Sequence, residues 1–185
     1  PNGYTSVYAH LQKFNDEIEE FVRDYQYKNK SFKVEIYPNA DQLKVNKGEL
    51  IAISGNSGSS GAPHLHFELR ETKTEAPVNP LLYGFNIKDN ISPELVAIYI
   101  YPRSDKSRVN GKISKQKVNL VKNGNSYRLP ENVKIRTLGK VGLGLNMFDR
   151  LNEMPNKCGI YEIELFRNDK LIFHQRMDKF NFHET

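Results

Sequence analysis

Short runs in which apolar and polar residues alternate fill most of this chain, and turn-forming residues separate them. The clearest is FKVEIY at 32–37, and a longer strand-like run, ELVAIYIYP, occupies 94–102. A period of two is typical of strands with one buried face. Because strands are stable only when paired, such runs predict a mainly β fold.

Turn signals organise the second half of the chain. An Asn-Gly pair inside QKVNLVKNGNSYRL (116–129) predicts a hairpin, and GIYEIELFRNDKLIFHQRM (159–177) predicts another that turns at 167–170. Between them, NVKIRTLGKVGLGLNMFDR (132–150) is interpreted as a strand followed by a glycine-rich segment. Several short strands with such turns indicate a small immunoglobulin-like β-sandwich over residues 88–185.

One stretch has the helical period instead. NDEIEEFVRDYQYKN at 15–29 begins with a plausible N-cap, Asn15, and places four apolar side chains on one stripe: Ile18, Phe21, Val22 and Tyr25. We expect a helical insertion at about 15–30 that packs on one side of a sheet.

Residues 1–87 form the other predicted domain. Strands are expected at 3–11, 49–54 and 64–70, and APVNPLLYGF (76–85) is interpreted as a closing segment rather than a strand. Alternation along 3–11 places Tyr8 and His10 on the same strand face. The polar stretch 86–93 marks the boundary between the domains.

Composition excludes several classes of protein. The chain of 185 residues has a net charge of +5, but its basic residues are scattered, which argues against a nucleic-acid surface. No apolar run approaches the roughly 20 residues of a transmembrane helix. Cys158 is the single cysteine, so the chain has neither a disulfide framework nor a cysteine zinc site.

Two histidines one residue apart, in GAPHLHFELR at 61–70, are the main chemical signal. His64, His66 and Glu68 should share one strand face. Neutral imidazoles there can bind a metal, share a proton network, or divide these roles. Glu68 is either a hydrogen-bonded or surface carboxylate, or a partner for an imidazole.

The remaining histidines differ in what surrounds them in the sequence. His10 ends a predicted strand, and a sheet could bring it to the other two. His174 and His183 have no recognisable partner and are interpreted as ordinary strand or surface residues.

Three segments together resemble a known family. YAHL at 8–11, GELIAISGNSGSSGAPHLHFELR at 48–70 and VNPLLYGF at 78–85 are similar to the lysostaphin-type, or LytM-like, zinc metallopeptidases that cut peptidoglycan cross-bridges. The resemblance covers about residues 1–85 and implies a compact antiparallel sheet of the duplicated hybrid motif type. The glycine- and serine-rich loop lacks the Gly-Lys-Ser/Thr ending of a phosphate-binding loop, so it is expected to shape the rim of a groove.

The resemblance also implies roles for particular residues. His66 would be a zinc ligand, while His10 and His64 would flank the metal, orient the attacking water and stabilise the oxyanion. Zinc would activate that water and polarise the scissile carbonyl. Tyr8, Asn56 and Ser57 are expected to line the substrate groove.

The family takes two further zinc ligands, a histidine and an aspartate, from a strand well before YAHL, and this sequence contains no such motif. The sequence begins at Pro1, without a methionine, so we expect it to be an N-terminally truncated piece of a longer, exported protein, inactive by itself. The expected locations are the periplasm, the cell envelope or the exterior. The expected partners are peptidoglycan peptides and envelope proteins.

Three functions follow from this comparison. The first is a zinc-dependent endopeptidase of peptidoglycan cross-links, and the second is a catalytically degenerate cell-wall binding or regulatory module of the same family. The third is a structural piece of an envelope assembly.

Overall fold

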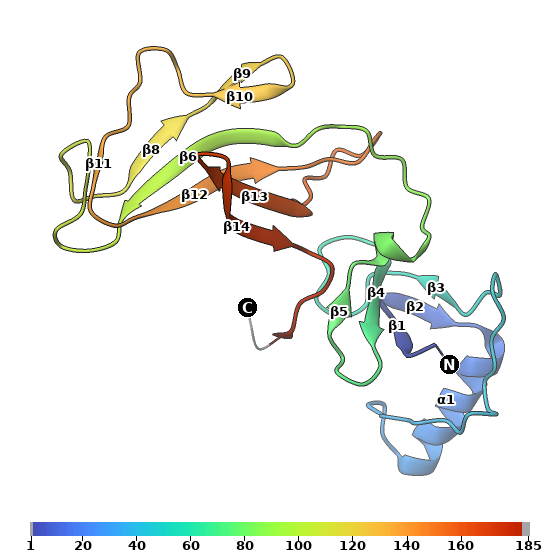
Figure 1. The fold of residues 1–185 in the computed structure, drawn as a ribbon. Helices are drawn as coiled ribbons and strands as arrows, with labels where there is room; N and C mark the ends of the chain where they lie inside the picture. Colours follow the sequence, from blue (N-terminus) through green and yellow to red (C-terminus); the bar gives the residue numbers. More distant parts are fainter. Residues whose placement is uncertain (1, 183–185) are drawn as a thin grey trace. The chain divides into compact units, whose positions relative to one another are not determined.

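A computed structural model describes residues 2–182 (Figure 1), so the prediction for His183 lies outside the described residues. The fold of these described residues is mainly β, as predicted, with antiparallel sheets and one α-helix. No helix among the described residues is long and apolar enough to cross a membrane. The chain divides into two compact units: the first comprises residues up to Pro80 and the segment from Lys179 onward, and the second is Leu81–Asp178.

The first unit is built on a three-stranded sheet in the order β1-β4-β5. Strand β1 (Tyr4–Ala9) pairs antiparallel with β4 (His66–Glu71), and β4 pairs with β5 (Pro77–Val78). A separate pair joins β2 (Leu11–Phe14) to β3 (Ala52–Ser54). Among the described residues of this unit, Ala76 and Val78 are the buried apolar ones. The strand predicted over 3–11 is therefore two strands that meet at His10.

Helix α1 (Asp16–Asn29) confirms the predicted helix and its cap. The Asn15 side chain accepts a hydrogen bond from the Ile18 amide at 2.9 Å, and the Asn15 amide donates to the Ile51 carbonyl at 2.8 Å. The second bond ties the start of the helix to the chain just before β3. Tyr25 is exposed rather than packed, so the apolar stripe ends one turn earlier than predicted.

Two other predictions for this unit are wrong. Residues 32–37 form no strand, and Phe32 at their start is 96% exposed. Alternation gives a segment an apolar face, but the segment becomes a strand only if a neighbouring strand offers a free edge to pair with. Residues 76–85 contain strand β5 and a 3₁₀ helix, η1 (Pro80–Tyr83). Pro77 is tolerated in β5 because the strand is only two residues long and starts there.

The segment after residue 178 returns to the first unit. Lys179 forms a β-bridge with Val78 on β5, and its Nζ donates to Glu71 Oε1 at 2.8 Å. The Phe180 amide donates to the Pro77 carbonyl at 3.2 Å. The outer edge of β5 is thus covered by residues that come much later in the chain.

The second unit centres on β6 (Glu94–Pro102), which lies between β12 (Val141–Phe148) and β8 (Gln116–Asn119). Ala97 and Ile100 of β6 are buried, as is Val109 of β7 (Arg108–Val109), which pairs with β11 (Thr137–Leu138). The glycine-rich segment is a strand, contrary to the prediction. A Cβ at Gly144 would lie 3.1 Å from the Tyr101 ring, so glycine makes room for that ring.

Both predicted hairpins are confirmed. Strand β9 (Val121–Asn123) pairs with β10 (Ser126–Arg128) around Gly124, whose φ of +62° requires glycine's freedom at the first loop position. Strand β13 (Glu162–Arg167) pairs with β14 (Lys170–Arg176), and both loop residues between them have positive φ, which matches the right-handed twist of the strands. The immunoglobulin-like arrangement of these strands stays a prediction.

Candidate active site

His10 lies where β1 ends, and its backbone takes a left-handed conformation with φ of 60°. Tyr8, two residues earlier, packs its ring 5.4 Å from that of Phe67. The His10 ring lies instead 4.7 Å from the His64 ring and 5.9 Å from the His66 ring, between centroids. Because Phe67 and His66 point to opposite faces of β4, His10 does not share a face with Tyr8. The left-handed residue breaks the alternation and brings the three histidines together.

The backbone around Gly55 holds two of these histidines in register. The Gly55 amide donates to the His10 carbonyl at 2.8 Å, and the His64 amide donates to the Gly55 carbonyl at 3.1 Å. Gly55 is buried, and a Cβ there would lie 2.6 Å from Cβ of Gln12. Only glycine allows β2 and the loop to approach this closely.

Hydrogen bonds fix the tautomers of His10 and His64. His10 Nδ1 lies 2.8 Å from the Ser57 carbonyl, and His64 Nδ1 lies 2.8 Å from the Ala62 carbonyl. A carbonyl oxygen only accepts, so each Nδ1 carries a proton and donates it. In the neutral ring, Nε2 then has a lone pair and can accept a proton or bind a metal.

His66 is held through its other ring nitrogen, Nε2. Its Nε2 lies 2.5 Å from Glu68 Oε1, and Arg70 Nε donates to Glu68 Oε2 at 2.7 Å. The Arg70 guanidinium, and after it the His66 ring, hold the pKa of the Glu68 carboxyl below its ordinary value. Glu68 is 23% exposed, so it is a hydrogen-bonded carboxylate and also the partner of an imidazole. With Nε2 bonded to Glu68, Nδ1 is the nitrogen of His66 left for a metal.

The geometry is that of a strand histidine held by a carboxylate, with the His10 ring beside it and the His64 ring beside that of His10. Residues 1–80 match the model of peptidase family M23. The match confirms the resemblance to lysostaphin-type peptidases for this part of the chain, which covers less than half of its length. A search of curated proteins and a search of solved structures each found no match.

The histidines of the M23 region supply only part of a zinc site. A catalytic zinc takes about three protein ligands and keeps one position open. Within residues 2–182, Glu162, Glu164 and His174 are the one group of three metal-binding side chains with ligand atoms within 4.8 Å of one another. That group is exposed on β13 and β14 and does not include His10, His64 or His66.

A cavity of about 640 Å³ adjoins His10 in the M23 region. Tyr8 and Ser57, two of the predicted groove residues, line it, whereas Asn56 is exposed and is not among its lining residues. The opposite wall comes from α1 and the chain after it, through Glu19, Val22, Gln26 and Phe32. The predicted insertion therefore contributes directly to the space beside His10.

Sequence reasoning missed three contributors to the site. Arg70 braces Glu68, and the signal for it was its position two residues along the same strand face. The close packing at Gly55 gave no signal beyond a glycine in a loop. The Ser60 hydroxyl donates to the Ala62 carbonyl at 2.8 Å and so supports the group that His64 bonds to.

Proposed function

We propose that this chain is part of a zinc-dependent metalloendopeptidase that hydrolyses the peptide cross-links of bacterial peptidoglycan. The observation that carries the proposal is the convergence of His10, His64 and His66 within the M23 region. Peptidoglycan lies outside the cytoplasm, so the proposal includes export to the periplasm, the envelope or the exterior.

The residues present fit part of the metal's requirements. His66 offers Nδ1 as a ligand while Glu68 holds its Nε2, an arrangement that fixes a ligating imidazole in orientation. When bound, zinc would polarise the scissile carbonyl and lower the pKa of a bound water toward about 7. The two further ligands would come from the histidine and aspartate that the resemblance implies upstream of Pro1.

His10 and His64 are proposed to act on protons. Each has its Nδ1 bonded to a carbonyl and its Nε2 available as an acceptor. One can take the proton of an attacking water, and the protonated ring can then donate to the developing oxyanion. The hydrogen bonds to the carbonyls keep both rings oriented, while Nε2 of each ring stays available as an acceptor.

Substitution of each histidine in the full-length protein tests these roles. His66→Ala should abolish zinc binding, measured as metal content after gel filtration. His10→Ala and His64→Ala should keep zinc but lower the turnover of purified peptidoglycan by roughly 10²- to 10⁴-fold, the usual contribution of general acid–base catalysis. If His66→Ala keeps both its zinc and its hydrolysis, the assignment of the site is wrong.

The degenerate binding module is the second candidate. It is favoured by one observation, that residues 2–182 offer only His66 as a ligand in this site, whereas a catalytic zinc takes about three protein ligands. The two proposals differ in one measurement on the full-length protein. Stoichiometric zinc with peptidoglycan hydrolysis supports the enzyme, whereas peptidoglycan binding without hydrolysis supports the module. The 185-residue chain alone should bind zinc poorly.

A further inference from the structure

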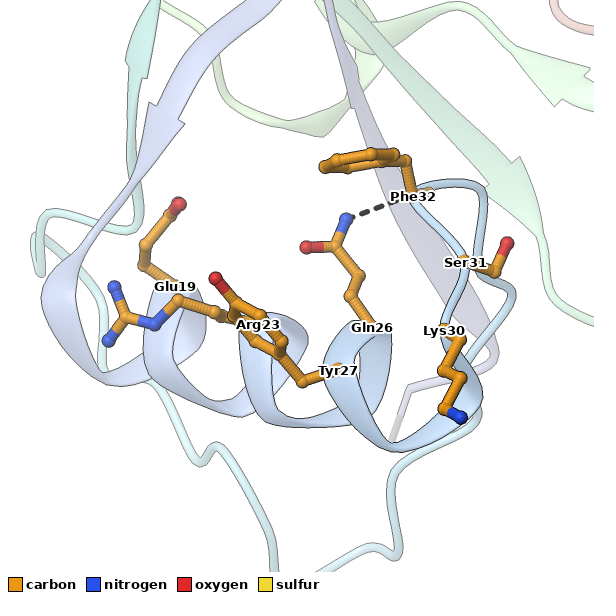
Figure 2. A pocket seen from close by; sticks show the side chains of 7 residues that line it. All are labelled: Glu19, Arg23, Gln26, Tyr27, Lys30, Ser31 and Phe32. Carbon is orange, nitrogen blue, oxygen red and sulfur yellow. Dashed lines mark hydrogen bonds between the residues drawn. The ribbon is translucent and has the colours of Figure 1, made fainter.

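Two adjoining cavities follow helix α1 away from His10. The inner one, of about 640 Å³, is lined by His10 and Ser57 at one end. The outer one, of about 490 Å³, is shown in Figure 2 and extends along the helix from Glu19 to Lys30. Both are lined by Glu19, Gln26 and Phe32, so they share a wall. Together they form what we call the α1 groove.

Two cations line the outer cavity of the α1 groove. Arg23 and Lys30 line it, and neither forms an ion pair with any other residue in 2–182. The one carboxylate there, Glu19, accepts a hydrogen bond from the Phe14 amide at 3.3 Å. Two cations without partners favour a ligand that carries a negative charge.

Aromatic rings line the same cavity. Tyr27 is 78% exposed and Phe32 is 96% exposed, although both line the outer cavity. The side-chain amide of Gln26 donates through Nε2 to the Phe32 carbonyl at 2.8 Å, so the Phe32 backbone is fixed to the helix (Figure 2). In that view the Phe32 ring lies across the cavity from Arg23 and Tyr27. A ligand that combines apolar groups with a carboxylate fits these surroundings.

The length of the groove suits a short peptide. From Glu19 to Lys30 the helix rises about 1.5 Å per residue, or roughly 16 Å in all. An extended peptide advances about 3.3 Å per residue, so roughly five residues would cover this distance. A single amino acid or a small ion would leave most of the groove empty.

We propose that the α1 groove binds the substrate peptide on one side of the scissile bond, and that Arg23 and Lys30 engage carboxylates of that peptide. The ligand class is an acidic, extended peptide. The link to cleavage rests on the proposed function, because the groove begins at His10. Binding itself requires neither a metal nor turnover, so it can be measured on this chain alone.

The test is a titration of the 185-residue chain, followed by amide chemical shifts, with a peptidoglycan stem peptide whose carboxylates are free. The same peptide with amidated carboxylates is the control ligand. The free acid should shift amides along 19–32 and near Ser57. The double variant Arg23→Gln/Lys30→Gln should weaken binding roughly fivefold or more, the scale of exposed charge pairs. The amidated peptide should bind weakly and equally to both proteins.

Lys28→Gln is the matched control variant, because Lys28 lies in the last turn of the same helix and is not among the lining residues of either cavity. It should leave the affinity unchanged. Equal weakening by Lys28→Gln, shifts confined to other surfaces, or no binding of the free acid would each overturn the proposal. Binding in the groove without peptidoglycan hydrolysis by the full-length protein would sink the proposed function and the link to a scissile bond, but leave acidic-peptide binding by the groove standing.

Discussion

Replacing Gly55 with alanine tests whether close backbone contact is what holds His10 and His64 together. The added Cβ would lie 2.6 Å from Cβ, 2.8 Å from the amide nitrogen and 2.9 Å from Cα of Gln12. Carbon atoms in ordinary contact are about 3.5 Å or more apart, so β2 and the loop would have to separate by roughly 0.9 Å. Two of the three crowded atoms are backbone, so a change of side-chain rotamer cannot relieve the overlap.

The cost has two parts. Overpacking of a well-packed position costs about 1–3 kcal/mol. The separation also stretches the bonds from the Gly55 amide to His10 and from the His64 amide to Gly55, each worth about 1 kcal/mol when intact. We therefore expect local destabilisation of about 2–4 kcal/mol.

Amide hydrogen exchange measures this locally, which matters because the chain has two units. Exchange of the His64 amide should be roughly 30- to 1000-fold faster in Gly55→Ala, the equivalent of 2–4 kcal/mol. Gly61→Ala is the control, because its Cβ would meet nothing within 4 Å and its φ is not positive. If the His64 amide exchanges at the same rate in the two variants, the contact at Gly55 does not organise the site.

Two further perturbations concern ion pairs of the same unit. Glu68→Leu should remove the preference of the His66 ring for a proton on Nε2, whereas Glu68→Gln, whose amide oxygen still accepts, should retain it. Long-range ¹H–¹⁵N spectra distinguish the two nitrogens, and a wild-type His66 protonated on Nδ1 alone would contradict this assignment. The Lys179 ammonium, and after it the Thr74 hydroxyl, lower the pKa of the Glu71 carboxyl below its ordinary 4.5. The pair therefore stabilises the folded state at pH values above the ordinary pKa of 4.5, and this stabilisation is lost as the pH falls through the lower pKa of Glu71 in the folded state. Lys179→Ala should raise the pKa of Glu71 in a carboxyl NMR titration, and an unchanged titration curve would refute the pairing.

Local turn chemistry explains which parts of the fold could be predicted. The hairpins at 121–128 and 162–176 have their strands and loop within one short segment, so the sequence contains nearly all the information needed. The cap of α1 is equally local, because Asn15 bonds three residues ahead. Strand pairing at long range is different. FKVEIY has the alternation of a strand, but the pattern does not state whether an edge is available to pair with it.

The three histidines of the candidate site were predictable from the sequence, but their arrangement was not. Motifs and alternation identified His10, His64 and His66, and they also placed His10 on the face of Tyr8. The positive φ at His10 puts its ring on the opposite face, and position 10 is neither a glycine nor an asparagine, which would have indicated a left-handed backbone. The assignment of ring protons depends on Ser57, Ala62 and Glu68 as neighbours, which only the folded chain brings into place.

The return of Lys179 to β5 bears on how this protein folds during synthesis. Lys179 and Glu71 are 108 residues apart, and the whole second unit is made between them. Contacts between residues so far apart in the sequence form late, because the entropy cost of closing the long loop must be overcome first. While the ribosome makes residues 81–178, the open edge of β5 can pair with any exposed strand, and β5 adjoins the strand that carries His66. The sheet beneath the candidate site is therefore vulnerable to mispairing until the ribosome has passed residue 179.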